Sequence, residues 1–212
     1  MAKQPKTKDG KLVLISGASR SGKTVFAMQR YRHPTTYPVV FVFDLENQWT
    51  KGAGFKHINS LRDLMRIAIN GDAGRYAFVP PGNDLKAEFE AFCQCVWHFA
   101  EFFGECVLIG EEMAELAGAS KASGTWGRII RGGLKRGITI VPIIQSWAEG
   151  DKTCMRNASE FVVFRMPTAG DIEYMSKKTR IPLQEMEGLK PLEYLIYDTT
   201  EFTVTRGKIT FK

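Results

Sequence analysis

A chain of 212 residues, 44% of them hydrophobic, is long enough for one α/β domain with a proper core and short for two. No run approaches the roughly 18 apolar residues that a membrane-spanning helix needs, so no membrane span is expected. The ordinary charge content and the net charge of +6 are typical of a soluble globular protein. We predict a short basic tail at 1–10, which lacks the apolar core of a signal peptide, and a single domain at 11–212.

Strand and helix patterns alternate along most of the chain. Strands are expected at 12–16, 39–43, 76–79, 107–109, 138–144 and 161–165. Helices are expected at 22–32, 60–70, 84–103, 124–134 and 171–179. This alternation predicts an α/β fold with a mostly parallel central sheet flanked by helices on both faces. Pro142 fits poorly in a central strand and predicts that its strand bulges or ends early.

The end of the chain has a different pattern. Three short apolar or alternating runs at 194–197, 201–205 and 209–211 are separated by polar turns. Such runs are typical of strands joined by tight connections. We therefore predict an antiparallel meander at the C-terminal end of the sheet.

The first expected strand runs directly into a glycine-rich loop that matches the phosphate-binding pattern G-x-x-x-x-G-K-[ST]. A helix-prone segment follows it, so a chance surface turn is the weaker interpretation. Its glycines permit positive φ angles, and its amides can form an anion-binding nest at a helix N-terminus. Lys23 would reach the β- and γ-phosphates of ATP or GTP, and the Thr24 hydroxyl would ligate Mg²⁺. The predicted nucleotide-binding residues are Gly17, Ala18, Ser19, Arg20, Ser21, Gly22, Lys23 and Thr24.

Polar side chains also follow three later strands, at the edge where α/β sheets bind ligands. Glu111 and Glu112 follow the fourth expected strand. We expect Glu111 to direct Mg²⁺ and Glu112 to polarise a water for attack on the γ-phosphate; an exposed acidic helix start is the alternative. Gln145 ends the fifth strand and is suited to sensing the γ-phosphate. Asp44 ends the second strand and is either a competing metal-directed carboxylate or the cap of a turn.

Two further patterns leave alternatives open. The spacing of Cys93, Cys95 and His98 superficially suggests a metal site, but positions two apart on a helix point in different directions, which favours buried thiols. Because the four cysteines show no paired framework, a reducing compartment is expected. The window 121–147 holds basic residues and no acidic ones. It could face a polyanion or be an ordinary solvated helix.

The order of these motifs resembles the FtsK/HerA superfamily of hexameric DNA-pumping ATPases. Over 12–178, a phosphate loop precedes a strand ending in Asp44, then Glu111-Glu112, a basic helix and a strand ending in Gln145. The compact size resembles in particular the genome-packaging ATPases of tailless icosahedral viruses with an internal membrane. The resemblance implies a RecA-like core in a homo-oligomeric ring, with ATP and Mg²⁺ as cofactors and hydrolysis coupled to translocation of double-stranded DNA. It also implies packaging of a viral genome into a capsid, in the virion or host cytoplasm, with portal or capsid-vertex proteins as candidate partners.

Two departures from the superfamily concern the site residues. Glu111 stands where the superfamily usually has Asp, so its metal geometry would be shifted. The arginine that the superfamily often carries before the Gln strand falls on Leu134 here. An arginine from a neighbouring subunit stabilises transition-state charge, which would explain a ring. The candidates for this role, in order of preference, are Arg131, Arg128 and Arg136.

DNA contact by such a pump would need no base recognition. Backbone contacts are enough for a motor that is indifferent to sequence, and one lysine per subunit could supply them. Lys121, in the small-residue loop at 117–124, is therefore the candidate pore element.

The main alternative is a small-molecule or nucleotide kinase of the P-loop fold. A kinase attacks with a substrate hydroxyl rather than a poised water, so it explains Glu112 and Gln145 less well. It also wants an arginine-rich lid late in the chain, where Arg180 and Arg206 are the only arginines after Arg165. A non-enzymatic switch or assembly factor that binds nucleotide is a third interpretation, and it would make Glu112 dispensable.

Overall fold

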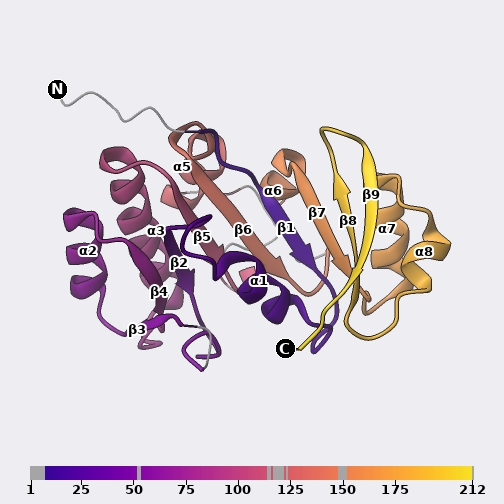
Figure 1. Ribbon diagram of the computed structural model, residues 1–212, viewed down its shortest axis with the longest axis horizontal. Helices are drawn as coiled ribbons and strands as arrows, with labels where there is room; N and C mark the ends of the chain where they lie inside the picture. The colour runs from indigo at the N-terminus through magenta and orange to yellow at the C-terminus, as the bar shows by residue number, and fades with distance from the viewer. Residues whose placement is uncertain are drawn as a thin grey trace.

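The computed structural model describes residues 8–51, 54–113, 116, 122, 124–147 and 152–211. Within them, nine strands form one sheet in the order β3-β4-β2-β5-β6-β1-β7-β8-β9 (Figure 1). The strands are β1 (Val13–Ser16), β2 (Val39–Phe43), β3 (Lys56–Ile58), β4 (Gly74–Phe78), β5 (Cys106–Gly110), β6 (Ile138–Ile144), β7 (Glu160–Phe164), β8 (Glu193–Asp198) and β9 (Thr203–Lys208). The helices are α1 (Lys23–Tyr31), α2 (Leu61–Asn70), α3 (Leu85–Phe102), α5 (Gly124–Gly132), α6 (Lys152–Asn157), α7 (Ala169–Thr179) and α8 (Leu183–Glu187), with a 3₁₀ turn η1 (Leu134–Arg136).

The pairing of neighbouring strands changes once across the sheet, from parallel to antiparallel. All neighbours from β3 to β7 pair in parallel, whereas β8 pairs with β7 and β9 with β8 in antiparallel fashion. The predicted mostly parallel α/β sheet with an antiparallel C-terminal end is therefore confirmed. β6 lies between β1 and β5, so three strands end side by side at one edge.

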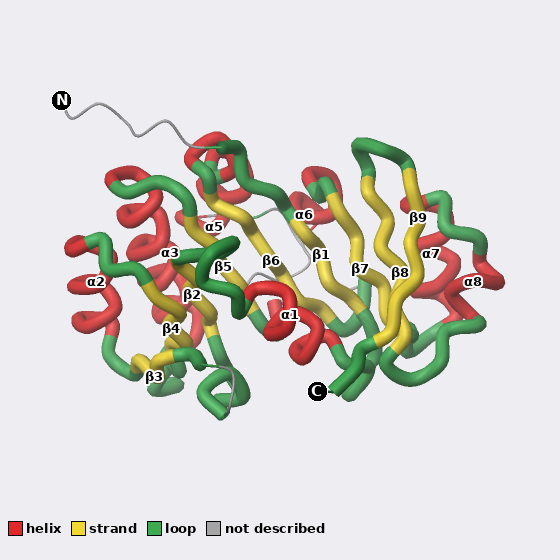
Figure 2. Tube along the Cα trace, in the orientation of Figure 1, coloured by secondary structure: helices red, strands yellow, loops and turns green. Residues whose placement is uncertain are grey.

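Alternate residues of each central strand face two separate hydrophobic cores. Leu12 and Leu14 belong to one core, while Val13 and Ile15 belong to the other. The first core packs against α2, α3, α5, α6, α7 and α8, whereas α1 is the described helix on the opposite face (Figure 2). Burial on both faces explains why these strands are continuous apolar runs rather than alternating patterns.

Short elements account for most differences from the predicted ones. The strand β3 and the helices α6 and α8 were not predicted, because three to six residues show too little periodicity to be recognised. The run at 209–211 is not a strand; it leaves the sheet after β9 and returns toward α1 (Figure 1). The helix α5 ends at Gly132, two residues earlier than predicted, because the adjacent Gly133 begins the turn into η1.

Pro142 does not shorten its strand. β6 continues to Ile144, and Pro142 pairs with Gly110 of β5. The N–H of Ile140 points toward β1, where it donates to Lys11 O at 2.7 Å, so the N–H that Pro142 lacks would point the same way. The β1–β6 pairing is interrupted there, between Leu12↔Ile140 and the pairs that begin at Ile143. The prediction of an early end was wrong because the N–H that Pro142 lacks weakens the pairing with β1 only, while the pairing with β5 continues.

The structure bears on the cysteines, on metal clusters and on membrane-spanning helices. All four cysteines are buried and none forms a disulfide, as expected for structural thiols. The described residues contain no group of three or more His, Cys, Asp or Glu side chains placed to hold a metal ion. Among the same residues, no helix has the length and apolar character for a membrane crossing. Positions 1–7 of the predicted basic tail lie outside the described residues.

Candidate active site

A cleft of about 650 Å³ opens at the carboxyl ends of β1, β5 and β6. Its volume is typical of a site for a small molecule or cofactor. It is lined by Ser19, Arg20, Ser21, Gly22, Lys23, Thr24, Val25, Glu46, Gln48, Glu111, Glu112, Ile143, Gln145, Leu192 and Phe211. The cleft thus brings together the glycine-rich loop, the two glutamates and the glutamine that the sequence predicted for one site.

The glycine-rich loop has the backbone that its residue types allow. Gly17 and Gly22 have φ angles of 151° and 110°, as predicted for these two glycines. A Cβ atom on Gly17 would lie 2.6 Å from the Cβ of Phe164, and one on Gly22 would lie 2.6 Å from Ile209 Cδ1. Arg20 also has a positive φ angle, 60°, which is strained for a side-chain-bearing residue. The loop is therefore packed closely from outside and cannot accept larger residues at either glycine.

Lys23 lies across its own loop. Its Nζ donates hydrogen bonds to the carbonyl oxygens of Gly17 at 2.8 Å and Ala18 at 3.0 Å. Burial lowers the pKa of Lys23 from its usual value, and the nearby charges of Glu112 and Glu111 act in the opposite direction. The lysine is thus held at the cleft by carbonyl groups that a phosphate oxygen could replace as acceptor.

Thr24 and Glu111 meet at the start of α1. The Thr24 hydroxyl donates to Glu111 Oε1 at 2.9 Å, and the Glu111 side chain is buried. This burial raises the pKa of Glu111 to about 7, while the neighbouring Trp49 and Thr24 act in the opposite direction. The indole Nε1 of Trp49 is buried beside this carboxylate but lies outside the geometry of a regular hydrogen bond. A carboxylate this poorly solvated favours a cation beside it.

These two side chains fit a magnesium ion. Mg²⁺ prefers oxygen ligands, and the hydroxyl of Thr24 and the carboxylate of Glu111 already lie at hydrogen-bond distance from each other. A cation held by Thr24 and Glu111 would also lower the cost of ionising Glu111 in its buried position. The chemistry of the pair therefore agrees with the predicted metal ligands.

Asp44 has a different set of partners. Its two carboxylate oxygens accept the backbone N–H groups of Gln48 and Trp49, each at 3.0 Å. The side chain is fully buried, and desolvation raises its pKa although both hydrogen bonds lower it. Asp44 does not line the cleft. This geometry is that of a cap on the turn after β2, one of the two alternatives left open by the sequence.

Glu112 and Gln145 form the second polar pair of the cleft. Gln145 Nε2 donates to the two carboxylate oxygens of Glu112 at 2.8 and 2.9 Å. Glu112 has a φ angle of 48°, in the left-handed region that a glutamate seldom adopts. Such strain accumulates at functional sites because the surrounding structure must hold it in place. The ends of β5 and β6 thus present a carboxylate and an amide together beside the phosphate loop.

The three candidate arginines lie away from this cleft. They belong to α5 and η1, which lie at the start of β6, whereas Gln145 follows the end of that strand. The seven residues of β6 separate the two ends by roughly 23 Å. Arg128 and Arg136 stack on the ring of Trp97, with the guanidinium carbons 4.0 and 4.3 Å from its centroid. Arg131 is exposed and donates to Ala122 O at 3.3 Å. The predicted pore residue, Lys121, lies outside the described residues.

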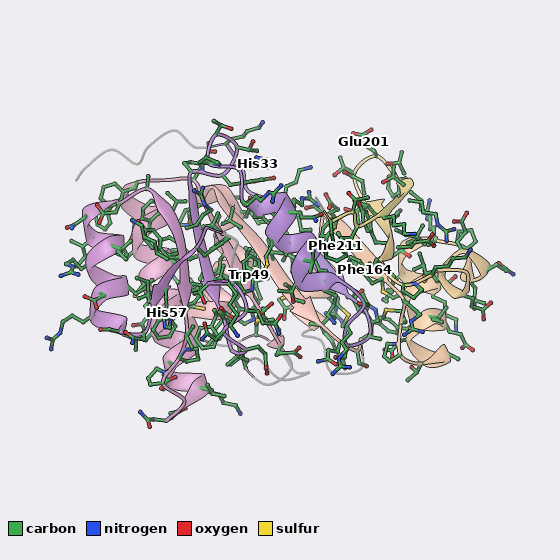
Figure 3. The ribbon with its side chains drawn as sticks, turned by 60° about the horizontal axis from the view of Figure 1, so that its bottom comes forward. His33, Trp49, His57, Phe164, Glu201 and Phe211 are labelled. Atoms are coloured by element: carbon green, nitrogen blue, oxygen red, sulfur yellow. The ribbon has the colours of Figure 1, made fainter. Side chains whose placement is uncertain are left out.

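Two residues that line the cleft, and one that packs behind it, were not predicted from the sequence. Trp49 packs next to Glu111, and Leu192 and Phe211 line the opposite side of the phosphate loop from the glutamates. Figure 3 shows Trp49 on one side of α1 and Phe211, next to Phe164, on the other. An isolated Trp, Leu or Phe in a connecting segment carries no motif. Their position at the site becomes visible only when the fold brings those segments back to α1.

Sheet order, phosphate loop and the polar residues that end β5 and β6 together define the class: the chain has the fold of the P-loop NTPases. No family model matches the chain. The comparisons with individual proteins narrow the resemblance further.

Protein P9 of Pseudoalteromonas phage PM2 is 25% identical over 204 residues, which cover 94% of this chain and 90% of P9. Among solved structures, the genome packaging NTPase B204 from Sulfolobus turreted icosahedral virus 2, in complex with AMP, gives a TM-score of 0.78 at 17% identity and covers 95% of this chain and 98% of B204. The bacterial conjugative coupling protein TrwB gives a TM-score of 0.69 at 11% identity over 98% of this chain and 89% of that one. The resemblance to FtsK/HerA-type ATPases that the sequence predicted is confirmed at the level of the fold.

Proposed function

We propose that the chain is an ATP-hydrolysing motor that translocates double-stranded DNA and packages a viral genome into a capsid. The proposal rests first on one observation: Lys23, the Thr24–Glu111 pair and the Glu112–Gln145 pair converge on a single cleft. These are the groups needed to bind a triphosphate and to direct water at it. A kinase would attack with a substrate hydroxyl rather than a poised water, so the Glu112–Gln145 pair makes a kinase the less favoured function.

Glu112 is the proposed general base. Its carboxylate would accept a proton from the attacking water, and Gln145 would orient that water or contact the γ-phosphate. In the structure the two side chains are bonded to each other, so Gln145 orients the Glu112 carboxylate, whose remaining lone pairs can accept a water. Contact between Gln145 and the γ-phosphate would link nucleotide binding to the position of the strand end of β6.

Lys23 and the loop amides would hold the phosphates. The lysine would exchange its bonds to the carbonyl oxygens of Gly17 and Ala18 for bonds to the β- and γ-phosphates. Mg²⁺, bound through Thr24 and Glu111, would supply charge that neutralises the phosphate oxygens.

The packaging role is supported by similarity rather than by the site. B204, whose fold this chain shares over nearly its full length, is a genome packaging NTPase. By this resemblance we propose a homo-oligomeric ring, a hexamer in the related superfamily, with Arg131 or another basic residue of the α5 region completing a neighbour's site. Lys121 is the proposed DNA contact, and portal or capsid-vertex proteins are the proposed partners in the virion or host cytoplasm.

The test is phosphate release from ATP with and without long double-stranded DNA. We expect DNA to stimulate turnover and the Glu112→Gln variant to abolish both the basal and the stimulated rate. Hydrolysis that is indifferent to DNA in assembled rings would contradict the translocation proposal. Phosphate transfer from ATP to a small-molecule acceptor, faster than release to water, would support the kinase alternative instead.

A further inference from the structure

The cleft has two chemically different sides, separated by the phosphate loop that follows β1. On the side of β6 and β5 lie the polar residues Glu111, Glu112 and Gln145. On the side of β7 and β8, the cleft residues are the apolar Leu192, just before β8, and Phe211, which follows β9. A nucleotide whose γ-phosphate faces the glutamates must therefore extend its base toward the apolar side.

Phe211 is unusually exposed for its size. Its side chain is 70% exposed although it lines the cleft. Singly exposed apolar residues are common at protein surfaces, but an aromatic ring at the open end of a nucleotide cleft offers a flat surface for a planar base. Leu192 adds an aliphatic contact from the preceding loop, with a positive φ angle of 66° that indicates local strain.

Hydrogen bonds fix the segment that carries Phe211. The N–H of Ile209 donates to Leu192 O at 2.9 Å, and Gln29 Nε2 of α1 donates to Thr210 O at 2.9 Å. The side chain of Ile209 packs against Gly22, whose missing Cβ leaves room for it. The segment is thus tied to the phosphate loop and to the helix that follows it.

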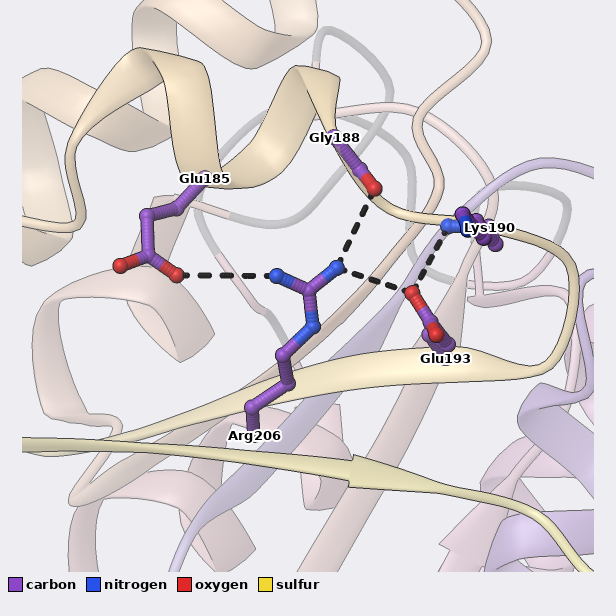
Figure 4. A network of polar contacts seen from close by, with 5 residues as sticks. All are labelled: Glu185, Gly188, Lys190, Glu193 and Arg206. Atoms are coloured by element: carbon purple, nitrogen blue, oxygen red, sulfur yellow. Dashed lines mark hydrogen bonds and ion pairs between the residues drawn. The ribbon is translucent and has the colours of Figure 1, made fainter.

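The loop that carries Leu192 is held by Arg206 of β9. Figure 4 shows the guanidinium donating to Gly188 O at 3.1 Å and to Glu193 Oε2 at 2.8 Å, with Glu185 at 3.9 Å. Glu193 Oε2 also accepts the N–H of Lys190 at 3.1 Å. These contacts connect both ends of the loop to β9, the strand that leads to Phe211. Leu192 and Phe211 are therefore positioned together.

We propose that Phe211 and Leu192 form the base-binding part of the nucleotide site, with the Phe211 ring stacked on the base. This assignment rests on the proposed nucleotide-binding function and extends it to the recognition of the ligand. Neither side chain carries a polar group, so contact area rather than hydrogen bonding selects the base. The site is accordingly one for purine nucleoside triphosphates, ATP and GTP alike, with weaker binding of the smaller pyrimidine nucleotides.

The test compares ATP with inorganic tripolyphosphate, which has the phosphates but no base. Binding of each is measured by calorimetry in the presence of Mg²⁺, for the full chain and for Phe211→Ala. We expect this substitution to weaken ATP binding about 5- to 100-fold, the usual effect of removing one stacking ring, and to leave tripolyphosphate binding unchanged. Phe211→Tyr, which keeps the ring, should restore ATP binding.

Phe202→Ala is the matched control. Phe202 is another exposed ring, 62% exposed, in the turn between β8 and β9, where it contacts Arg180 rather than the cleft. Its removal should change neither affinity. Equal losses of ATP and tripolyphosphate binding in Phe211→Ala, or no loss of ATP binding, would overturn the assignment.

Failure of the underlying function gives a different result. If the unchanged protein binds neither ATP nor tripolyphosphate, the nucleotide-binding proposal itself is wrong, and the base site is wrong with it. If the unchanged protein binds both ligands with the same affinity, nucleotide binding stands but no base site exists. Lys23→Ala, which removes a phosphate contact, should weaken both ligands and so separates phosphate recognition from base recognition.

Discussion

Glu112 and Gln145 illustrate how two side chains acquire a joint role through their geometry. The amide nitrogen lies 2.8 and 2.9 Å from the two carboxylate oxygens, and the glutamate backbone is held in a left-handed conformation. The amide orients the carboxylate without placing a positive charge beside it. The strained backbone fixes where that carboxylate points.

Replacing Glu112 by Gln should therefore separate binding from chemistry. The variant keeps the side-chain volume and the phosphate contacts, so we expect ATP to bind normally while turnover falls about 10²- to 10⁴-fold, the usual contribution of a general base. Equilibrium binding and phosphate-release rates measure the two effects. Glu46→Gln, which removes an exposed carboxylate from the same cleft, is the control and should keep its turnover. Near-normal turnover in Glu112→Gln would transfer the role to Glu111 or Asp44.

Glu111 should make the stability of the metal-free, nucleotide-free protein depend on pH. Its pKa is raised from 4.5 to about 7, so in this window the folded chain holds a proton that the unfolded chain has lost. The free energy of unfolding contributed by this group is therefore fully present below pH 4.5 and is lost as the pH rises through about 7. The loss is on the order of 3 kcal/mol.

Denaturant unfolding at pH values on either side of this window measures that loss. Glu111→Gln cannot ionise, so its stability should fall less with rising pH than that of the unchanged protein. Glu201→Gln, at an exposed turn, is the control and should retain the full pH dependence. Identical pH profiles for Glu111→Gln and the unchanged protein would show that burial does not perturb this carboxyl.

At the scale of elements, the turn after β2 shows how a carboxylate can serve the fold beside a site. Asp44 holds two backbone N–H groups that would otherwise be buried without acceptors. This turn brings Trp49 against Glu111, and Trp49 packs edge-on against Phe55 at a centroid distance of 5.0 Å. The turn therefore shapes one wall of the cleft.

Asp44→Asn tests whether this residue caps the turn or directs the metal. Asparagine offers one acceptor oxygen instead of two, so we expect a loss of about 1–3 kcal/mol in the free energy of unfolding. Magnesium-dependent nucleotide binding should persist in the protein that remains folded. Asp63→Asn, which removes an exposed ion pair with Arg66, should cost far less. Unchanged stability with loss of magnesium-dependent binding would instead identify Asp44 as the metal-directed carboxylate.

The connection from α5 to β6 distinguishes among the arginines. Arg136 is half-buried, stacks on Trp97 and donates to Gly132 O at 3.3 Å, so its contacts stabilise its own chain. Arg128 shares the Trp97 ring but is exposed. Arg131 lies one turn further along the exposed side of α5 with a single carbonyl contact in the described residues. An arginine that reaches a neighbouring subunit must be free to leave its own surface, which favours Arg131.

At the scale of the whole molecule, an active site that needs an arginine from the neighbouring subunit would make an assembled ring more active than separate subunits. Arg131→Ala subunits mixed with unchanged subunits should depress ATP turnover beyond their share, because each variant would inactivate its neighbour's site as well. Turnover is measured across a series of mixing ratios. Arg66→Ala, at an exposed position on α2, is the matched control and should leave the mixtures unaffected. A loss that is merely proportional to the variant fraction would argue against an arginine supplied in trans.

Much of the fold could be predicted because its signals are local. The apolar runs of β1, β2 and β6 and the capped starts of α2, α3 and α7 lie within single segments. The effect of Pro142 was predicted wrongly because it is not local. Its effect depends on which neighbour its missing N–H would face, and the pairing of β6 with both β1 and β5 decides that.

The candidate site divides in the same way. Sequence alone determined the phosphate loop and the Glu111, Glu112 and Gln145 positions, because a loop motif and polar residues at strand ends can be recognised within a few residues. Tertiary structure decided that Asp44 bonds to its own turn and that Phe211 returns to the phosphate loop across nearly the whole chain. The physical reason is that strand order and packing join segments distant in sequence, and no local pattern specifies which segments will meet.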